Sequence, residues 1–405
     1  MAHSKESLTD GELRVDDGAL RYIAKDGSFD VGLVDIALAG EYTTPYGPAA
    51  CDYFLVFVTT AGVRHEASGY AAGLDAALDA LQSYWQVSLH PQLMASTSFR
   101  SNIVWPPQYA GEELFQFVER PALGFLGRIR ARIGLSGLVE HWSPAALETL
   151  LDVAHRELDD DPGRALAMTQ RILEEAGESA ARHRHVHGRA WKEHGTALYM
   201  AGRLGEALEA SQRARAIFEE DPQLVSDRAS ALLLTALVQN ARKDNEANEA
   251  ALVLLEECMS AFAACNDSRG MLKALELRGI VLFDLRRYSE AVSTLQHALT
   301  EVSKLGDERE LARIENNIGR CALQAENHSE AMHYVQRAAF RFNELKMEAE
   351  CARAWWCMAR IHEALGEKTD ALRGFQRVEK EFRKLGMISM AEQASEDRTR
   401  LAGAA

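Results

Sequence analysis

Basic, amide and aromatic side chains recur at a fixed interval in the second half of this 405-residue sequence. Three triplets share the spacing i, i+3, i+7 and follow one another at that interval: Lys273, Glu276 and Ile280; Arg313, Asn316 and Arg320; Arg353, Trp356 and Arg360. On a helix this spacing keeps the members of a triplet on one stripe. A guanidinium group donates two parallel hydrogen bonds to a carboxylate, and an indole ring offers a flat surface to a cation or an apolar group. The triplets therefore predict a surface that binds acidic protein segments.

A similar stripe lies nearer the middle of the chain, with the members Arg189, Lys192, Thr196 and Tyr199. An arginine on a helix surface is commonly solvated or paired with a neighbouring glutamate, and this interpretation stands beside the binding one. The adjacent Trp355 and Trp356 bear on the choice. Neighbouring helical residues point about 100° apart, so both indoles cannot face a core. One of them is expected at the surface or in a groove.

Sequence signatures of catalysis are absent. The chain contains none of the motifs G-x-x-x-x-G-K-[ST], G-x-G-x-x-G, G-x-S-x-G and H-E-x-x-H, which mark phosphate, dinucleotide, serine-hydrolase and zinc-protease sites. We therefore expect a protein that is not an enzyme and needs no cofactor. One alternative stays open, because carboxylates of the first region can meet in the folded state: Asp30, Asp35, Glu41 and Asp52.

Histidine and cysteine side chains are candidate metal ligands. His183, His185 and His187 alternate along the chain, with His194 nearby. On a strand they would share a face and suit zinc, but at the start of a helix residues i and i+2 diverge. Cys351 and Cys357 lie six residues apart on different faces of one expected helix. We predict no metal site, and we expect the cysteines to pack.

Composition excludes several classes of protein. Acidic residues outnumber basic ones by 60 to 45, and the net charge of −15 argues against non-specific binding of nucleic acid. No apolar run approaches the length of a membrane-spanning helix, and the polar start lacks the apolar core of a signal peptide. Six scattered cysteines without a C-x-x-C motif indicate reduced thiols. The expected compartment is the cytoplasm, without membrane insertion.

Proline divides the chain into two regions. Seven of the nine prolines precede residue 150, and none follows Pro222. Proline interrupts helices, and the second region is rich in the strong helix formers Ala, Leu, Glu and Arg. The sequence therefore predicts a first region with strands and turns and a second region that is continuously helical.

The second region repeats itself. Ala251, Ala291, Ala331 and Ala371 are evenly spaced, and Ala165 and Ala207 extend the series upstream. A second small or apolar residue follows seven positions later in most copies: Ala214, Cys258, Ala298, Ala338 and Val378. Twelve positions before the alanine stands a small residue in four copies: Gly195, Gly279, Gly319 and Ala359. Such residues let two helices approach to about 8–10 Å at a crossing.

This pattern resembles the tetratricopeptide repeat, in which each unit is a pair of antiparallel helices. The tryptophan position of that repeat is matched by Trp191 and approached by Leu275 and Trp355. The interval of about 40 residues is longer than the usual length of about 34, as in kinesin light chains, spindle-orientation adaptors and the peptide-receiving regulators of Gram-positive bacteria. The resemblance implies six helix pairs and a final helix near 389–401, which together form an α-solenoid over residues 141–401.

The resemblance also implies a binding surface. Repeats of this kind stack into a superhelix whose concave face, lined by the first helix of each pair, binds peptides or helices of other proteins. Asn317 matches an asparagine that holds the ligand backbone in the long-repeat adaptors, and an amide can pair with both N–H and C=O. The candidate groove residues are Arg189, Lys192, Tyr199, Lys273, Arg313, Asn316, Asn317, Arg320, Arg353, Trp356 and Arg360.

The first region predicts a small α+β domain over residues 1–108. Short apolar runs separated by Asp17-Gly18 and Asp26-Gly27 indicate about five strands in a meander, because these pairs favour tight hairpin turns. A helical period follows over 71–84. This order of elements is similar to the pleckstrin-homology type. Residues 109–140 are expected to form a helical connector that includes Arg128, Arg130 and Arg132.

The sequence therefore predicts a mainly α protein that acts as a non-catalytic adaptor and binds a partner protein or peptide, with an acidic segment as the expected ligand. A second hypothesis is a peptide- or ligand-sensing regulator whose repeats control the N-terminal domain. A third is an enzyme in the first region, which requires a deep polar pocket there.

Overall fold

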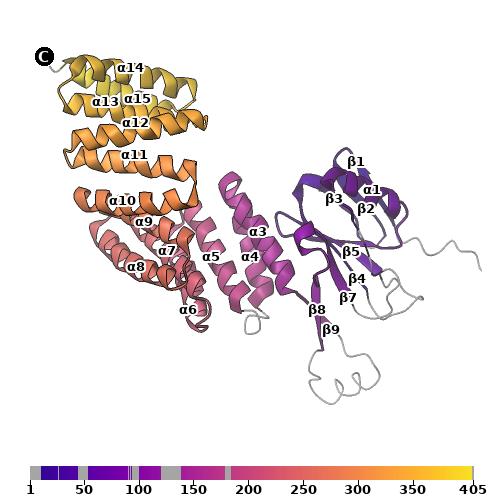
Figure 1. The fold of residues 1–405 in the computed structure, drawn as a ribbon. Coiled ribbons are helices and arrows are strands. Elements are labelled where there is room, and N and C mark those ends of the chain that lie inside the picture. Colours follow the sequence, from indigo (N-terminus) through magenta and orange to yellow (C-terminus); the bar gives the residue numbers. More distant parts are fainter. Residues whose placement is uncertain are drawn as a thin grey trace, which may run out of the picture. The chain divides into compact units, whose positions relative to one another are not determined.

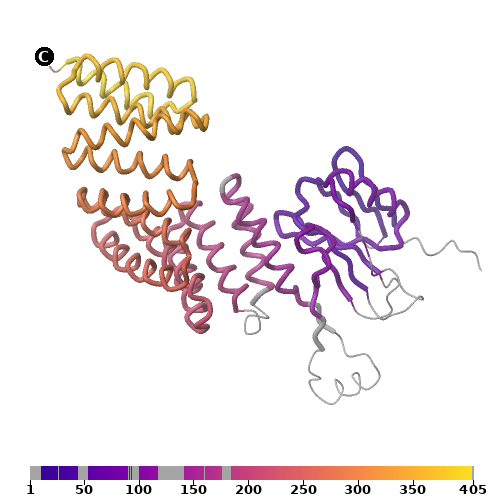
Figure 2. Tube along the Cα trace, in the orientation of Figure 1, coloured from indigo at the N-terminus to yellow at the C-terminus, as the bar shows by residue number. Residues whose placement is uncertain are grey.

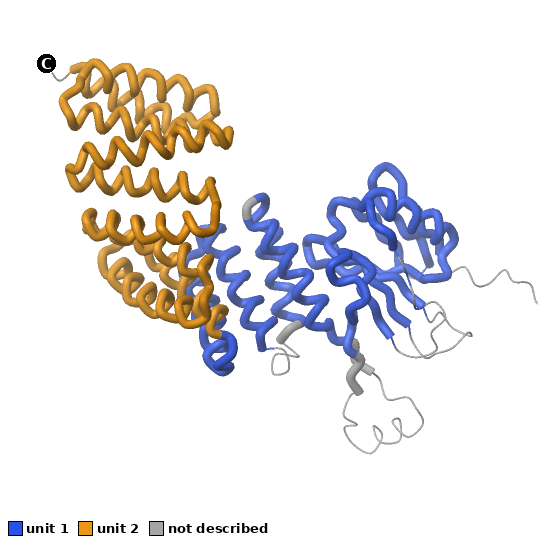
Figure 3. The backbone as a smooth tube through the Cα atoms, in the orientation of Figure 1, with its two compact units in different colours: residues 1–224 blue, residues 225–405 orange. Residues whose placement is uncertain are grey.

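The computed structural model describes residues 11–25, 27–43, 53–89, 91, 93, 100–119, 138–177 and 184–403. The chain divides into two compact units, residues 1–224 and residues 225–405, and Figure 3 shows them in different colours. Each unit is described by itself below. Figure 2 follows the course of the chain from indigo at the N-terminus to yellow at the C-terminus.

Unit 1 begins with two antiparallel sheets. The first has the order β1-β2-β3 and consists of Glu12–Asp16, Ala19–Ile23 and Phe29–Gly32. The second has the order β6-β5-β4-β7 and consists of Arg64–Ser68, Tyr53–Thr59, Ile36–Thr43 and Arg100–Trp105. A left-handed Asp17 and Gly18 form the turn between β1 and β2, as the Asp-Gly pair predicts.

The helix expected after the strands is present as α1, Leu74–Trp85. The meander does not end with this helix, however, because β7 follows it and pairs with β4. This pairing joins residues about 60 positions apart, and a local pattern of apolar residues does not reveal it.

The expectation of a helical connector over 109–140 is wrong in the described part. A short 3₁₀ helix, Pro107–Tyr109, leads to two antiparallel strands, β8 at Phe115–Glu119 and β9 at Leu138–Trp142. Arg128, Arg130 and Arg132 lie outside the described residues.

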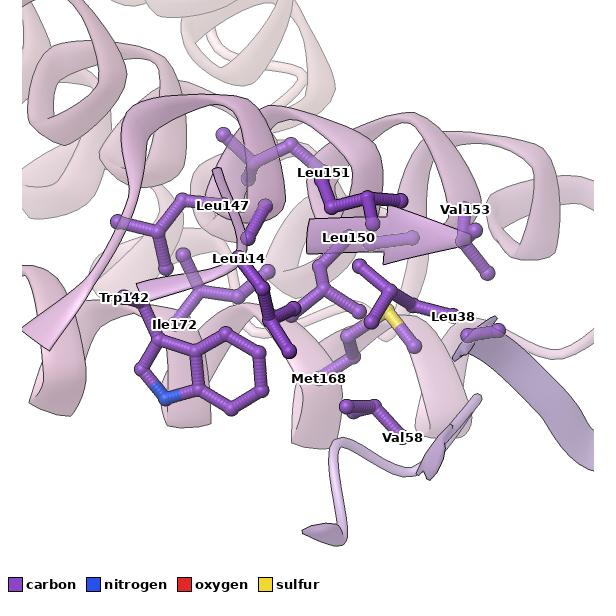
Figure 4. Close-up of a cluster of buried hydrophobic side chains, with 14 of the residues drawn as sticks. Leu38, Val58, Leu114, Trp142, Leu147, Leu150, Leu151, Val153, Met168 and Ile172 are labelled. Atoms are coloured by element: carbon purple, nitrogen blue, oxygen red, sulfur yellow. The ribbon is translucent and has the colours of Figure 1, made fainter. Parts of the chain in front are cut away.

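Four helices complete unit 1: α3 at Pro144–Asp160, α4 at Pro162–Gly177, α5 at Arg184–Met200 and α6 at Leu204–Glu219. Ser143 caps α3 by accepting a hydrogen bond from the Ala146 amide. Three of the four helices, α3, α4 and α5, share a core with the second sheet. Figure 4 shows Leu38 and Val58 of the sheet beside Leu147, Leu150 and Met168 of α3 and α4, all buried.

The described part of unit 2 is built from helices. They form four pairs and a final helix (Figure 1): α7 at Val225–Ala241 with α8 at Asn245–Ala264, α9 at Ser268–Asp284 with α10 at Tyr288–Leu305, α11 at Glu308–Gln324 with α12 at His328–Glu344, α13 at Glu348–Ala364 with α14 at Lys368–Lys384, and α15 at Ile388–Gly403. Together with α3/α4 and α5/α6 of unit 1, the six pairs and the terminal helix predicted from the repeat are present.

The repeated small residues lie where the helices cross. Ala251, Ala291, Ala331 and Ala371 are all completely buried. Gly319 of α11 is buried as well, and a Cβ placed there would lie 2.3 Å from Cγ2 of Val335 on α12. A larger side chain has no room at this crossing, which explains the pattern in the sequence.

Residues in the left-handed backbone conformation follow the helix ends at the interval of the repeat. Arg286, Glu326 and Gly366 follow the first helix of their pairs, whereas Gly306, Lys346 and Gly386 follow the second. A residue in this conformation stops a helix and turns the chain back. The helix pairs from α9 onwards therefore recur at a constant interval.

The expected domain boundaries, 1–108, 109–140 and 141–401, stay a prediction. Strands end at Trp142 and helices begin at Pro144, but the division between the compact units falls between Leu224 and Val225. None of the described helices has the length and apolar content that crossing a membrane requires.

Candidate partner-binding site

A cavity of about 380 Å³ opens on unit 2. Its polar lining consists of Asn316, Arg320, Gln324, Arg353 and Arg360. Its apolar lining consists of Phe283, Leu323, Trp356, Cys357 and Met390. These residues belong to α9, α11, α13 and α15, which we call the A helices. Among the described residues, the lining includes none from α10, α12 or α14, the B helices.

Five residues that the sequence predicted for the groove meet in this cavity: Asn316, Arg320, Arg353, Trp356 and Arg360. The constant interval of the repeat brings α11 and α13 into the same register, so that residues at equal positions become neighbours. Trp356 lines the cavity and also packs against the cluster around Phe382 of α14, whereas Trp355 packs in that cluster and in the one beside α12 without lining the cavity. Of the two adjacent indoles, only that of Trp356 therefore reaches the cavity.

Arg360 and Trp356 bind a carboxylate of the chain itself. The Trp356 indole N–H donates to Oδ2 of Asp397 at 3.0 Å, and Arg360 donates to the same oxygen through Nε at 3.2 Å and Nη2 at 3.1 Å. The Arg360 guanidinium also lies over the Trp356 ring, 4.6 Å from its centroid. Burial alone would raise the pKa of Asp397, but the charge of Arg360 and the hydrogen bonds lower it below its usual value.

The other two guanidinium groups of the cavity have no such partner. Arg320 lies 5.3 Å from the centroid of the Phe283 ring. Within the described residues, no hydrogen bond or ion pair joins Arg320 or Arg353 to another side chain. Both side chains are exposed. They leave donors that a ligand can use.

Asn316 adds an acceptor. The residue is half-buried and lines the cavity, and its Oδ1 atom is shielded from solvent without a hydrogen-bond partner in the described structure. A shielded polar atom without a partner costs free energy, roughly 1–3 kcal/mol. A donor from a bound molecule, such as a peptide N–H, removes that cost.

A mixed-charge cluster lies on the same stripes outside the cavity lining. It contains Lys273, Glu276, Glu310 and Arg313, and Arg313 pairs with Glu310 at 3.0 Å. Burial, together with the negative charge of Glu310, raises the pKa of Glu276 to about 7. Ile280 completes the stripe of α9 and is 41% exposed.

The remaining candidates do not join the cavity. Asn317 is half-buried on α11 but does not line it. Arg189 and Lys192 belong to unit 1, where Arg189 pairs with Asp152 of α3 and Lys192 lies 3.0 Å from the buried Glu193. Tyr199, also on α5, is half-buried. The stripe on α5 therefore serves ion pairs within unit 1.

Sequence reasoning missed half of the lining: Phe283, Leu323, Gln324, Cys357 and Met390. Phe283 and Leu323 stand ten residues after Lys273 and Arg313, so an extension of each stripe by three residues finds them. Met390 and Asp397 of α15 give no comparable signal, because neither belongs to a stripe of basic residues in the sequence.

The histidines and carboxylates of the other hypotheses lie apart. His185 contacts Glu148, His187 accepts from the Trp191 indole, and His194 contacts Thr169. His183 and Asp52 lie outside the described residues.

Among the carboxylates of the first region, Asp30 pairs with Arg21 and Asp35 with Arg164. The fully buried Glu41 accepts hydrogen bonds from Tyr53 and from the Leu93 amide. Asp30, Asp35 and Glu41 thus have different partners.

Comparison with known proteins identifies the repeat. Residues 270–339 match the family model described as tetratricopeptide repeat. None of the curated proteins matches the sequence.

Among solved structures, a STAND signal-transduction ATPase with a tetratricopeptide repeat sensor from Pyrococcus horikoshii is 14% identical, with a TM-score of 0.51 over 69% of this chain and 40% of its own. The TPR-like repeats of a kinesin light chain from Podosopora anserina are 16% identical, with a TM-score of 0.41 over 50% and 98% of the two chains. A Rap protein in complex with competence and sporulation factor is 15% identical, with a TM-score of 0.46 over 64% and 71%. At 14% identity, the match to the STAND ATPase shows a shared fold alone.

Proposed function

We propose that this tetratricopeptide-repeat protein is a non-catalytic adaptor that holds an acidic segment of a partner protein in the cavity on the A helices. The observation that carries the proposal is the pair Arg320 and Arg353, which line the cavity with no ion-pair partner in the described structure. A guanidinium group without a carboxylate partner is suited to bind one from another molecule, in a two-point contact that fixes its orientation.

The rest of the lining suits a peptide. Phe283, Leu323 and Met390 offer apolar contact beside the arginines. The Oδ1 atom of Asn316 can accept the N–H of an extended main chain. Together these groups match an acidic side chain on a peptide whose next residue is apolar.

Electrostatics favours such a ligand although the whole chain is acidic. With a net charge of −15, the protein repels anions at long range. The arginines make the local potential in the cavity positive, so binding of an acidic segment should depend on close complementarity of charge and shape. Partner affinity should then fall as salt rises, because screening weakens the attraction of exposed groups.

A second candidate function is the sensing of a small peptide or other small ligand that controls the N-terminal domain. Its support is the volume of the cavity, about 380 Å³, which lies within the range of small-molecule sites. The two functions differ in the response to ligand. A sensor compacts in small-angle scattering when ligand is added, whereas an adaptor keeps its dimensions.

The proposal is tested with the double variant Arg320→Glu/Arg353→Glu of the full chain. Both arginines are exposed, so the reversal should leave the melting temperature nearly unchanged. Proteins retained from a native lysate by the parent and lost by the double variant are then titrated as purified partners at low and high salt. We expect at least about a tenfold loss of affinity at low salt, since like charges replace attraction.

The matched control is Arg269→Glu/Arg309→Glu, which makes the same change of charge at exposed residues in the first turns of α9 and α11, outside the cavity. Equal affinity of all three proteins for every captured partner would exclude the cavity as the binding site.

A further inference from the structure

The carboxylate of Asp397 lies where a ligand of the cavity is expected. It accepts three hydrogen bonds from Trp356 and Arg360, at 3.0 to 3.2 Å. Both donors line the cavity, and so does Met390 of the same helix, α15. Asp397 is only 14% exposed, whereas Arg360 is 47% exposed. The carboxylate thus covers one part of the basic lining and leaves Arg320 and Arg353 open.

Asp397 differs from the residues at the same position of the preceding A helices. Asn317, Cys357 and Asp397 are evenly spaced and occupy the same position of three successive A helices. The two earlier helices carry a neutral residue there. Only the terminal one of these three A helices carries an anion, and that anion faces the arginine of the preceding A helix.

The packing of α15 combines apolar and polar contacts. Its buried residues are two alanines, Ala391 and Ala394, and the partly buried Met390 and Leu401 pack against neighbouring clusters. Ion pairs supplement them: Arg400 with Glu363 at 2.6 Å and Arg398 with Glu379 at 3.1 Å. Arg400 is exposed, and a pair at such a position contributes little to stability. A competing anion at this subsite has to replace the hydrogen bonds that the Asp397 carboxylate accepts from Trp356 and Arg360.

We propose that Asp397 is an intrachain competitor of the acidic partner: it fills one of two carboxylate subsites of the cavity, and a partner with two acidic side chains displaces it. The first subsite is formed by Trp356 and Arg360, and the second by Arg320 and Arg353. The inference rests on the proposed function and specifies which partners the cavity selects. A ligand with one carboxylate takes the second subsite alone, whereas one with two carboxylates must exchange with Asp397.

The exchange explains how selectivity arises. A carboxylate that replaces Asp397 gains the same donors that Asp397 loses, so this subsite adds little net affinity in the parent protein. Once the competing charge is removed, the full interaction becomes available to the ligand. Asp397 is thus a specificity-determining residue that weakens binding of strongly acidic segments.

The test uses fluorescein-labelled hexaglutamate as the probe and the full chain in four forms: the parent, Asp397→Asn, Asp397→Ala and the control Glu392→Gln. Glu392 is exposed on the same helix and does not line the cavity, so its replacement makes the same change of charge elsewhere on α15. By fluorescence anisotropy we expect both Asp397 variants to bind the probe about five- to tenfold more tightly than the parent, as close charge pairs allow. The control should change affinity less than twofold, about the size of a screened surface effect.

A second measurement on the parent alone does not depend on the folding of a variant. The indole N–H signal of Trp356 in a nitrogen-15 NMR spectrum, assigned with Trp356→Phe, should move when hexaglutamate is added, because its acceptor changes. A neutral hexaglutamine peptide should leave the signal in place.

The outcomes separate the two proposals. If the parent binds hexaglutamate, Arg320→Glu/Arg353→Glu abolishes binding and the Asp397 variants bind no better than the parent, the acidic-segment proposal stands and the competitor is excluded. An unmoved indole signal at saturating probe excludes it as well. If neither the parent nor the Asp397 variants bind, both proposals fail together.

Discussion

Among single residues, Glu276 has the clearest consequence for pH dependence. Burial and the nearby Glu310 raise the pKa of Glu276 from the ordinary 4.5 to about 7, although Lys273 and Arg313 partly oppose this. The folded chain therefore binds a proton at Glu276 in a range of pH where the unfolded chain has released it. By linkage, this proton stabilises the fold fully below the ordinary pKa of 4.5, and its contribution is lost as pH rises through about 7.

We therefore expect Glu276→Gln to increase the free energy of unfolding at pH above 7, where the parent carries a poorly solvated charge. The gain should be about 1–3 kcal/mol and should vanish at pH near 4, where Glu276 is neutral in both states. Urea unfolding at several pH values measures it. Glu344→Gln, at an exposed position of α12, is the control and should show no such pH dependence. A gain of equal size at all pH values would contradict the raised pKa.

Some site residues were predictable from the sequence and others were not. Arg320, Arg353 and Arg360 were found because their regular spacing along the chain survives folding unchanged. Asp397 was not found, because an acidic residue on a terminal helix has the appearance of an ordinary solvated side chain. Only its distance to Trp356, on another helix, reveals its role.

At the level of elements, the helix crossings determine how closely the pairs of unit 2 pack. Gly319 lies against the backbone as well as a side chain, since an added Cβ would be 3.1 Å from the Ala331 carbonyl oxygen and 3.3 Å from the Val335 nitrogen. The Val335 side chain can rotate away from an added Cβ, but the backbone of α12 can make room only if the whole helix moves.

Gly319→Ala should consequently destabilise the protein by roughly 1–3 kcal/mol, despite the better helix propensity of alanine, because overpacking outweighs propensity. Gly319→Leu should be worse. The control is Gly205→Ala in α6, where a Cβ meets nothing within 4 Å. That change should stabilise by up to about 1 kcal/mol. Thermal unfolding compares the three variants, and an alanine at 319 that raises the melting temperature would disprove the tight crossing.

The elements also show where prediction from sequence is limited. The helices of the repeats followed from alanine and glycine at fixed spacing, because each crossing is local and recurs. The strands β8 and β9 did not follow. Their pairing joins segments far apart in sequence, such as Glu119 with Leu138, and neither segment carries a regular alternation that identifies it alone.

For the molecule as a whole, the division between the units bears on folding. The helices α3 to α5 share a core with the strands of unit 1, through residues such as Leu147, Met168 and Ala190. Unit 2 has its own apolar clusters along α7 to α15. The boundary near residue 140, expected from the sequence, would separate the first helices from the sheet on which they pack.

We accordingly expect residues 225–405 to fold alone into a helical unit with a cooperative thermal transition, because each repeat contacts its neighbours. A fragment of residues 141–405 should also be helical, but its helices α3 and α4 should exchange amide hydrogens rapidly, since their packing surface is exposed. Circular dichroism and hydrogen exchange test both fragments. Failure of the shorter fragment to fold would place the boundary elsewhere, and slow exchange in α3 of the longer one would support the boundary near 140.

The left-handed turns of unit 2 recur at the interval of the repeat, so removal of one whole repeat leaves the position of the remaining turns unchanged. Gly306 and Lys346 occupy the same position in successive turns. Removal of residues 308–347 therefore places Leu305, Gly306 and Asp307 before Glu348, where Leu345, Lys346 and Met347 stand in the parent. A single residue lost within a helix instead rotates every later side chain of that helix by about 100°. The array can thus gain or lose whole repeats while the remaining stripes keep their orientation. The number of binding positions can therefore change without a change in the fold of each repeat.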